Sequence, residues 1–352
     1  MKYISINIDN FRGIKKIEIE DLKRINVLVG RNNCGKTTIL ESIFLLSGMS
    51  NPQLPVNIHN FRDLILSEDK DFNFMFHNMD FTFPVKINGQ IDNRKRSLSI
   101  NPIFVDYNPK TSEKIKQTEI SNNETVSSST DFVRLIEGIR LEFKNYQNKN
   151  FNSQISIKEG KIRVDGKYKE ELKCSFLNPK TILQTDVKSM ENLIVQKKMN
   201  PIIKILKQIE LNLLDIRMVG STLYVDIGQN KLLPLNIMGD GMRRILSILI
   251  AIQNMENGII LIDEIENGLH YTSLSILWKA LLLATKEFNV QIITTTHSYE
   301  CIEAFSKSYM EEEPEGDDIR LYRIDKRENT HYAYKLTTKS IIAGIEKEFE
   351  VR

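Results

Sequence analysis

The sequence predicts an α/β fold in which helices flank a mostly parallel core sheet. Residues 258–264 and 290–298 each hold a continuous apolar run, and residues 274–288 between them have the length of a helix. Residues 25–30 add a third β-branched run, which ends at a glycine. Strands buried on both faces show such runs, and the order strand–helix–strand is typical of a parallel sheet. An antiparallel β lobe at the N-terminus and an inserted mixed α/β region complete the expected fold.

The composition is that of an ordinary globular protein. The chain has 352 residues, of which 41% are hydrophobic and 27% are charged. Its net charge of +2 gives no overall basic field that would attract nucleic acid. Three scattered cysteines suit a reducing compartment. The N-terminus lacks an apolar leader, and the longest apolar run, residues 245–252, is far below the ~20 residues that span a bilayer. We therefore expect a cytoplasmic protein without a membrane partner.

The N-terminal segment changes its pattern of apolar residues twice. Tyr3–Phe11 and residues 14–22 alternate apolar and polar side chains around Gly13, which predicts a hairpin of half-buried strands. Residues 25–30 then form the buried run described above. Residues 37–48 follow with helical spacing and end at a glycine, which predicts a helix.

The middle of the chain has shorter and more polar patterns. Residues 81–87 and 139–146 resemble short strands, and residues 155–166 resemble a hairpin. Residues 107–130 are rich in Ser, Asn, Thr and Lys, which predicts a mobile loop. Apolar spacing becomes helical over residues 189–214.

The tail and the order of these patterns give the expected domain organisation. An acidic run at residues 310–318 precedes a strand, and a further strand and a helix close the chain. We expect residues 1–85 to form the N-terminal half of one head domain and residues 201–352 its C-terminal half. Residues 86–200 would form an insertion between them.

The segment GRNNCGKTT matches the phosphate-loop pattern G-x-x-x-x-G-K-[ST]. It follows a predicted buried strand and opens a predicted helix, which is the context that such a loop requires. Backbone N–H groups and the helix N-terminus would bind phosphates. Lys36 would reach the β- and γ-phosphates of ATP, and the Thr37 hydroxyl would bind Mg²⁺. A glycine turn that merely caps a helix is the alternative. The candidate nucleotide-binding residues are Gly30, Arg31, Asn32, Asn33, Cys34, Gly35, Lys36, Thr37 and Thr38.

Two further segments place polar residues at the ends of predicted buried strands. In LIDEIENGLH, Asp263 would complete the Mg²⁺ site and Glu264 would orient or deprotonate water. In TTTHS, His297 would sense the γ-phosphate, because ligands of parallel sheets bind at the carboxyl ends of the strands. Solvated acids and a structural histidine are the alternatives. Lys36, Asp263, Glu264 and His297 are thus the candidate catalytic residues.

These three segments, in this order, resemble the Walker A motif, the Walker B motif with its catalytic glutamate, and the switch histidine of ABC-class ATPases. The opening ISINIDNFRGIKKIEIEDLKRINVLVGRNNCGKTTILESI resembles the SMC, RecF and overcoming-lysogenization-defect branch of that class. The long stretch between Lys36 and Asp263 is also similar. The resemblance covers residues 1–50 and 205–305, roughly, and implies a P-loop ATPase of the kind found in DNA repair and anti-phage defence.

In this class two heads enclose each ATP between the phosphate loop of one head and a signature motif of the other. The resemblance assigns that motif to MGDGMRR, residues 238–244, so that Gly239, Asp240 and Gly241 would contact the partner's nucleotide. Gly239 replaces the serine of the family motif LSGGQ, and Asp240 replaces its first glycine. A simple helix cap with Asp240 as the cap residue is the alternative. The resemblance also places Arg12 near the nucleotide.

The resemblance implies a slow ATP-hydrolysing switch that forms a homodimer or higher homo-oligomer around ATP. Such a switch would control a separately encoded effector, a nuclease or a toxin, in phage defence or DNA maintenance. A fused Toprim nuclease is not expected, because fewer residues follow His297 than the ~100 of a typical domain.

The alternative is a RecF-like clamp that binds DNA and hydrolyses ATP slowly. Basic residues that could contact DNA phosphates are Arg94, Lys95, Arg96, Lys197 and Lys198, although such runs are usually solvated. A transporter ATPase fits less well, since it has a short gap between the Walker motifs and an intact LSGGQ.

Overall fold

The computed structural model describes residues 1–64, 71–107, 114–115, 133–145, 147–156, 162–164, 168–182, 187–210, 212–220 and 222–346. Its chain forms two compact units. The core unit comprises residues 1–5, 18–40 and 172–352, and the β unit comprises residues 6–17 and 41–171. The boundaries of these units therefore differ from those expected from the sequence, which followed residues 85 and 200.

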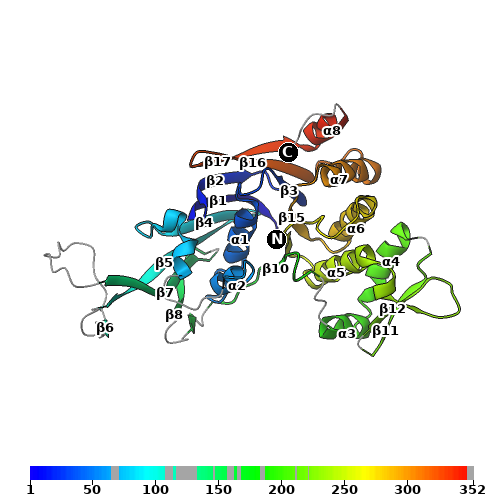
Figure 1. Cartoon of the computed structure of the whole chain (residues 1–352), viewed down its shortest axis with the longest axis horizontal. Helices are drawn as coiled ribbons and strands as arrows, with labels where there is room; N and C mark the ends of the chain where they lie inside the picture. Colours follow the sequence, from blue (N-terminus) through cyan, green and yellow to red (C-terminus); the bar gives the residue numbers. More distant parts are fainter. Residues whose placement is uncertain are drawn as a thin grey trace. The chain divides into compact units, whose positions relative to one another are not determined.

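The core unit contains a six-stranded sheet that is parallel except at one edge (Figure 1). Its pairs are parallel from β10 to β16, and β16 and β17 are antiparallel. This confirms the predicted mostly parallel core sheet. In spatial order the strands are β10 (Cys174–Leu177), β14 (Ile259–Ile262), β15 (Gln291–Thr295), β3 (Ile25–Val29), β16 (Ile319–Arg327) and β17 (Thr330–Thr337).

The three central strands of this sheet have the burial that their continuous apolar sequences predicted. Every residue of β3, β14 and β15 is buried, as expected for strands covered on both faces. The surrounding helices of this unit are α5 (Asp240–Asn254), α6 (Leu274–Glu287), α7 (Tyr299–Glu312) and α8 (Thr338–Glu346). The fully buried Trp278 of α6 packs against Phe305 of α7 with the ring planes tilted by 42°, and its indole N–H donates to the Cys301 carbonyl at 3.0 Å. The sequence predicted α6 but not α7, whose apolar positions are interspersed with charges.

The segment before α5 holds a second, smaller set of elements. Helices α3 (Val187–Val195) and α4 (Met199–Ile209) confirm the helical spacing seen in the sequence. A three-stranded sheet that the sequence did not predict follows, formed by β11 (Asp215–Val219), β12 (Thr222–Asp226) and β13 (Leu233–Pro234). No helix within the described ranges is long and apolar enough to cross a membrane.

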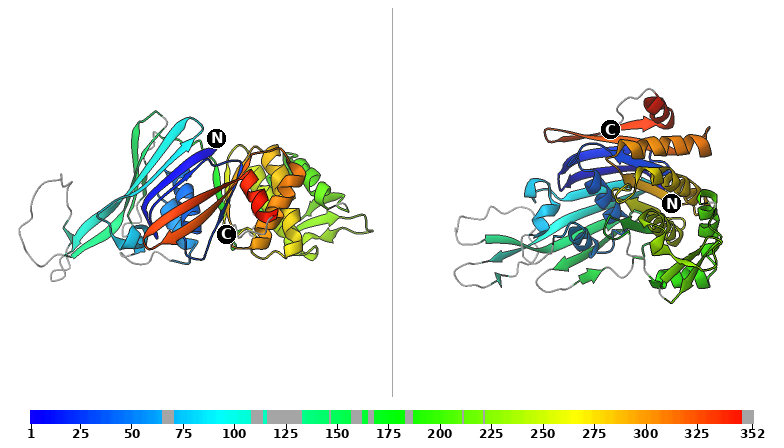
Figure 2. Two further views of the ribbon diagram at one scale, coloured as in Figure 1. Left: turned by 90° about the horizontal axis from the view of Figure 1, so that it is seen from above. Right: turned by 45° about the vertical axis from the view of Figure 1, so that its right-hand side comes forward.

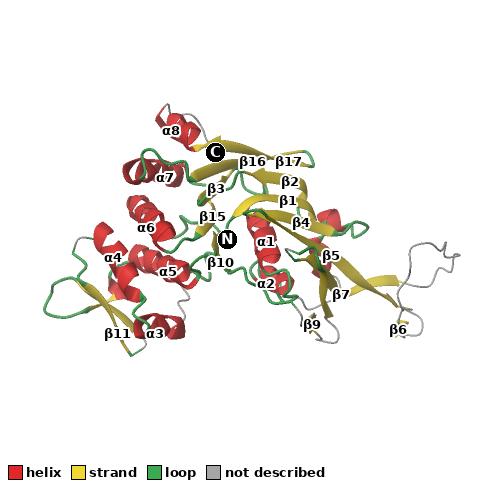
Figure 3. Ribbon diagram, turned by 180° about the vertical axis from the view of Figure 1, so that it is seen from behind, coloured by secondary structure: helices red, strands yellow, loops and turns green. Residues whose placement is uncertain are grey.

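The β unit is dominated by strands, whereas helices dominate the core unit (Figure 3). Its sheet has the order β2-β1-β4-β5-β7-β8-β9, with β6 paired to β5. The N-terminal hairpin and the later hairpin of β8 and β9 were both predicted. The strands are β1 (Tyr3–Phe11), β2 (Ile14–Glu20), β4 (Val85–Ile91), β5 (Arg94–Tyr107), β6 (Lys114–Ile115), β7 (Val133–Lys144), β8 (Asn150–Ser156) and β9 (Ile162–Val164).

The predicted mobile loop, residues 107–130, is described only in part. Tyr107 ends β5, and Lys114 and Ile115 form β6, which pairs with β5 in antiparallel fashion. The loop prediction is wrong for these three residues, because backbone pairing orders them. The other residues of the predicted loop lie outside the described part of the chain.

Two sets of buried ion pairs stabilise the β unit. The Glu41 carboxylate lies 3.0 Å from Arg12 Nε and 2.7 Å from Arg62 Nε. Elsewhere, Arg96 is only 1% exposed, and its guanidinium lies 2.7 Å from Glu170. Arg96 therefore cannot serve as a surface contact for DNA phosphates, which corrects that part of the sequence interpretation. Along β5 its side chain faces inward, while those of Arg94 and Lys95 are exposed.

Candidate functional site

The phosphate loop connects β3 to α1 (Lys36–Ser47) and has an unusual backbone. Gly30, Asn33 and Gly35 have φ values of 139°, 61° and 96°. A Cβ atom at Gly30 would collide with the carbonyl oxygen of Ile324 in β16. Position 30 thus requires glycine for its backbone conformation and for its close approach to the neighbouring strand.

Lys36 lies across this loop at the first turn of α1. Its ammonium donates to the carbonyl oxygens of Gly30 at 2.8 Å and Arg31 at 3.0 Å. Beneath it, burial raises the pKa of the Cys34 thiol, so that the sulfur acts as a small apolar filler rather than a nucleophile. The loop therefore holds a cation at its mouth, where backbone N–H groups and the helix N-terminus also favour phosphate.

Thr37 and Asp263 meet although they are far apart in the sequence. The Thr37 hydroxyl lies 3.1 Å and 3.0 Å from the two carboxylate oxygens of Asp263. Thr295, at the end of β15, donates to Asp263 Oδ1 at 2.7 Å and so fixes the carboxylate. A hydroxyl and a carboxylate are hard oxygen donors of the kind that Mg²⁺ prefers. These residues therefore fit a magnesium ion shared with nucleotide phosphates.

Glu264 follows Asp263 in a strained conformation with a φ of 49°. The backbone N–H of Glu264 donates to the Thr295 hydroxyl at 2.8 Å, and its carboxylate accepts a hydrogen bond from the Asn267 amide at 3.0 Å. Strain of this kind is retained only where the surroundings enforce it, and it is frequent at functional sites.

Glu266 is a site residue that the sequence interpretation missed. Its carboxylate is buried and accepts a hydrogen bond from the His297 backbone N–H at 2.8 Å. The same oxygen lies 2.9 Å from His297 Nδ1. This contact favours the proton on Nδ1 and leaves Nε2 as the ring nitrogen for a ligand. A third acid close behind Asp263 and Glu264 was visible in the sequence, but nothing there showed that it contacts His297.

Arg244 joins helix α5 to the same loop and was also missed as a functional contact. Its buried guanidinium donates from Nη2 to the Glu264 carbonyl at 3.2 Å. Burial lowers the pKa of Arg244, while the Glu266 and Glu264 carboxylates oppose this shift. One guanidinium thus connects the helix that follows the signature-like segment to the backbone of the candidate catalytic glutamate.

The signature-like segment lies at the start of α5. Gly239 is the cap residue with a φ of 91°, and Asp240 is the first residue of the helix. The alternative that made Asp240 the cap is therefore wrong. Ile237, two residues before Gly239, is 69% exposed, and Tyr271, two residues before Ser273, is 66% exposed. The start of α5 lies close to the segment that contains Ser273, because a Cβ atom at Gly241 would lie 3.2 Å from the Ser273 hydroxyl oxygen.

Arg12 belongs to the β unit and is engaged there. Besides its ion pair with Glu41, it donates from Nη2 to the Ile58 carbonyl at 3.3 Å. Burial lowers the pKa of Arg12 to about 10, with Glu41 opposing the shift. These contacts show that Arg12 stabilises the β unit. Its contact with nucleotide stays a prediction.

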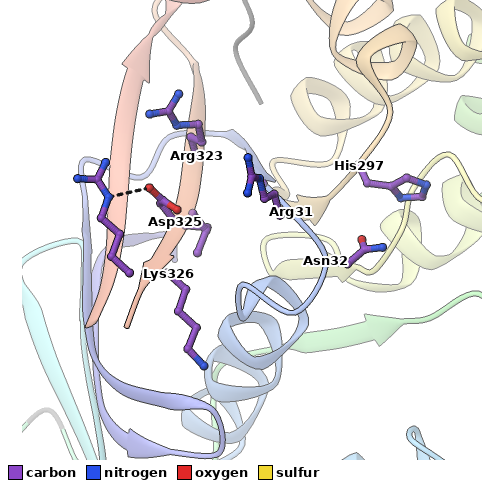
Figure 4. A pocket seen from close by; sticks show the side chains of 9 residues that line it. Arg31, Asn32, His297, Arg323, Asp325 and Lys326 are labelled. Atoms are coloured by element: carbon purple, nitrogen blue, oxygen red, sulfur yellow. Dashed lines mark hydrogen bonds and ion pairs between the residues drawn. The ribbon is translucent and has the colours of Figure 1, made fainter. Parts of the chain in front are cut away.

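A cavity of about 800 Å³ borders the first residues of the phosphate loop (Figure 4). Its volume lies in the range of small-molecule sites. The cavity lies between the loop and β16, the strand next to β3, rather than at Lys36 and Thr37. Its lining residues are Gly30, Arg31, Asn32, His297, Arg323, Ile324, Asp325, Lys326 and Arg327.

This fold and this loop define an ABC-class P-loop ATPase of the SMC/RecF branch. Residues 25–303 match the family model described as "AAA domain, putative AbiEii toxin, Type IV TA system". The match covers well over half of the sequence, and the chain belongs to this family.

Similar proteins agree with that assignment. An "ATP/GTP phosphatase" of Helicobacter pylori is 25% identical over 343 residues, which cover 88% of this chain and 89% of the relative. A "DNA replication and repair protein RecF" of Clostridioides difficile is 49% identical over 47 residues, or 13% of each chain. The RecF similarity is thus strong but local.

Solved structures show the same fold at low sequence identity. An Smc head bound to the C-terminal winged-helix domain of ScpA has a TM-score of 0.52 and 11% identity, covering 96% of this chain and 99% of that one. A Pyrococcus furiosus Smc head with an extended coiled coil, bound to the C-terminal domain of ScpA, has a TM-score of 0.50 and 10% identity, with coverages of 98% and 99%. These likenesses concern the fold alone.

Proposed function

We propose that the chain binds ATP with Mg²⁺ and hydrolyses it slowly. The observation that carries this proposal is the contact between Asp263 and Thr37, the residue that follows Lys36. These groups come from the first turn of α1 and the end of β14, and they combine a phosphate-binding cation with oxygen donors for a metal. The H. pylori relative, named an ATP/GTP phosphatase, supports the same chemistry.

The residues of the loop would bind and orient the nucleotide. Backbone N–H groups of residues 30–38 would contact the phosphates, and Lys36 would exchange its bonds to Gly30 and Arg31 for the β- and γ-phosphates. Thr37 and Asp263 would hold Mg²⁺, which when bound neutralises charge that develops on the transferred phosphoryl group.

Glu264 would take the proton from the attacking water. General bases of this kind contribute about 10²–10⁴-fold to a rate. The Asn267 amide holds one carboxylate oxygen of Glu264 in place. His297 would bind the γ-phosphate region through Nε2, because Glu266 holds its Nδ1 side. Glu266 acts here as a positioning residue.

ATP would also join two or more copies of the chain. Gly239, Asp240 and Gly241 would contact the nucleotide of a second subunit through N–H groups at the start of α5. Exposed Ile237 and Tyr271 lie beside that helix start and would be covered in the assembled state. Differential affinity for ATP would thus drive assembly, and hydrolysis would reverse it.

The assembled and open states would control a separately encoded effector in phage defence or DNA maintenance. The family description, which names a putative toxin of a type IV toxin–antitoxin system, supports a role in such a system. The Smc heads of similar fold are bound to ScpA, which shows that a head of this fold can carry a partner. ATP state would set whether the effector is held or released.

The decisive variant is Glu264→Gln. It keeps the Mg²⁺ and phosphate contacts but removes the general base, so ATP should accumulate in an assembled dimer or larger oligomer. Mass measurement by light scattering during gel filtration, with and without Mg²⁺–ATP, checks this. Glu264→Gln combined with Lys36→Ala is the matched control and should stay unassembled. A Glu264→Gln mass that does not change with ATP would refute the shared-nucleotide proposal.

A further inference from the structure

Helices α7 and α8 of the core unit enclose a groove that is separate from the nucleotide site. Helix α7 lies between α6 and α8 (Figure 2). The groove has a volume of about 630 Å³, and α7 and α8 supply all of its described lining residues. None of these lining residues is a candidate nucleotide-binding or catalytic residue.

The groove is lined by apolar side chains from both helices. Ile342 and Ile345 lie three residues apart in α8 and therefore share one face of that helix. Both are only partly buried, and Met310 of α7 is 38% exposed. Solvent thus reaches a group of apolar side chains, as is typical of a surface that a protein partner covers.

Ser306 adds a buried polar group to the same groove. It is 1% exposed, and its hydroxyl has no hydrogen-bond partner among the described residues. A serine within a helix can bond to the carbonyl one turn before it, but this hydroxyl does not. Buried hydroxyl groups without a partner are unfavourable and rare. A polar group that enters the groove would satisfy this one.

The exposed surface of α7 is acidic. Glu303 lines the groove and pairs with Lys307, one turn away, at 2.7 Å. Three more glutamates of α7 are exposed, of which Glu311 pairs with Lys279 of α6. The helix thus carries four carboxylates and one ammonium group, and the acidic run of residues 310–318 begins in its last turn. This excess of negative charge favours a basic partner.

The turn between α3 and α4 has the opposite charge and is also apolar. Ile194 is 36% exposed and Val195 is 81% exposed. Lys197 and Lys198 follow closely and are exposed as well. We call residues 194–198 the α3–α4 corner. It lies at the other end of the core unit from α8, so the corner and the groove of one chain do not meet (Figure 1).

We propose that the α3–α4 corner of one copy of the chain binds in the α7–α8 groove of a second copy. The two apolar residues of the corner cover the apolar side chains of the groove, and its two lysines pair with the glutamates of α7. Gln196, between these two pairs in the sequence, supplies an amide for the Ser306 hydroxyl. Each copy offers both surfaces, so the contact repeats head to tail and builds a ring or a filament.

This contact goes beyond the proposed dimer around ATP, because it involves neither nucleotide nor the signature-like segment. The corner also favours a second copy over a different basic protein. A different protein would cover the groove but leave Val195 in solvent, and Val195 is the most exposed large hydrophobic residue in the described part of the chain. A contact between copies covers both surfaces at once.

The test is sedimentation velocity of the full chain without nucleotide, at about 1–100 µM, the range in which modest interfaces associate. We expect the mass to rise with protein concentration. Val195→Ser should weaken the association about tenfold, since one buried apolar side chain contributes on this order. Val219→Ser, at another exposed valine of the core unit, is the matched control and should associate as the wild type does.

Exchange of charges identifies the two surfaces that meet. Lys197→Glu with Lys198→Glu should remove the association, and so should Glu303→Lys with Glu311→Lys, because each double variant brings like charges together. An equimolar mixture of the two double variants should associate again, since every corner in the mixture finds a groove of opposite charge.

Glu256→Lys with Glu287→Lys makes the same change of charge at two exposed glutamates outside the groove and should associate as the wild type does. Thermal melting checks that each variant is folded. The proposal is overturned if the wild-type mass does not change with concentration, if Val195→Ser associates normally, or if the mixture of double variants stays unassociated. Because nucleotide is absent, none of these results bears on the ATP-dependent assembly of Glu264→Gln.

Discussion

The Asp263 site of the core unit and the buried ion pairs of the β unit arrange their carboxylates differently. In the β unit, Glu41 lies between two arginines, and Arg96 is paired with Glu170. Each of these contacts joins segments of the β unit that are far apart in the sequence. In the core unit, the Asp263 carboxylate accepts hydrogen bonds from the Thr37 and Thr295 hydroxyls.

The ion pairs of the β unit stabilise its fold, whereas the hydroxyl contacts of Asp263 belong to the candidate functional site. Hydroxyl and carboxylate oxygens are the donors that Mg²⁺ prefers, so Asp263 and Thr37 suit a metal ion, whereas guanidinium groups hold the carboxylates of the β unit. Parallel strands explain where this happens, because their carboxyl ends bring distant segments to one edge of the sheet. The following variants test whether the two units divide their tasks in this way.

The largest effect is expected at the core site. Glu264→Gln should lower steady-state phosphate release by about 10²–10⁴-fold, since the general base is lost, while affinity for ATP is kept. A coupled assay of phosphate release measures the rate, and calorimetry with ATP measures affinity. Glu287→Gln, an exposed glutamate of α6, is the control and should behave as the wild type. Normal phosphate release by Glu264→Gln would show that Glu264 is not the general base.

In the β unit, Arg96→Met should change stability rather than chemistry. Breaking a buried ion pair while one partner remains costs about 3–5 kcal/mol. Urea unfolding should therefore show a transition of the β unit at lower denaturant, with ATP affinity of the folded protein unchanged. The neighbouring Lys95→Met, exposed on the same strand, should unfold as the wild type does. Loss of ATP binding in folded Arg96→Met would contradict the claim that this ion pair contributes only to stability.

An intermediate effect is expected at the contact between Glu266 and His297. Glu266→Gln should slow phosphate release by about tenfold, at the low end of the loss seen when a histidine's orienting carboxylate is removed. Glu256→Gln is the control. A merely structural role would lower the melting temperature, whereas a positioning role slows phosphate release in a protein that melts as the wild type does.

The smallest effect concerns acid stability of the core unit. A hydrogen bond from Arg320 lowers the pKa of Asp317 to about 2. A carboxylate with a depressed pKa stabilises the fold above its unfolded value near 3.9, and this contribution disappears as the pH falls toward about 2. Unfolding midpoints measured across this window should fall with pH. Asp317→Asn should flatten that dependence, and an unchanged dependence would show that other groups dominate.

The sequence revealed most of the core unit because its signals are local. Continuous apolar runs predicted β3, β14 and β15, and the loop pattern placed Lys36 and Thr37 between a strand and a helix. Glu266 and Arg244 escaped prediction because their roles arise from tertiary contacts, with His297 and with the Glu264 carbonyl. No local pattern encodes those contacts.

The β unit was harder to interpret for a related reason. Its strands are short or polar, and the basic run at residues 94–96 looked uniformly exposed. Alternation along β5 instead turns Arg96 inward, to Glu170 and to the Leu46 carbonyl, while Lys95 stays outside. Which face of a polar strand is buried depends on its neighbours in the sheet, which the sequence does not name.

The central claim, that each ATP is shared by two copies of the chain, is tested most directly by mixing two inactive variants. Lys36→Ala disables the phosphate loop, and Gly239→Glu places an acid at the signature-like segment, where an added Cβ meets no atom within 4 Å but the φ of 91° strains any residue other than glycine. Circular dichroism checks that both variants fold. Each alone should release no phosphate, and an equimolar mixture should regain about a quarter of wild-type activity, since half of the dimers are mixed and each has one intact site. Activity that stays absent after mixing, with mixed dimers present, would contradict the shared site.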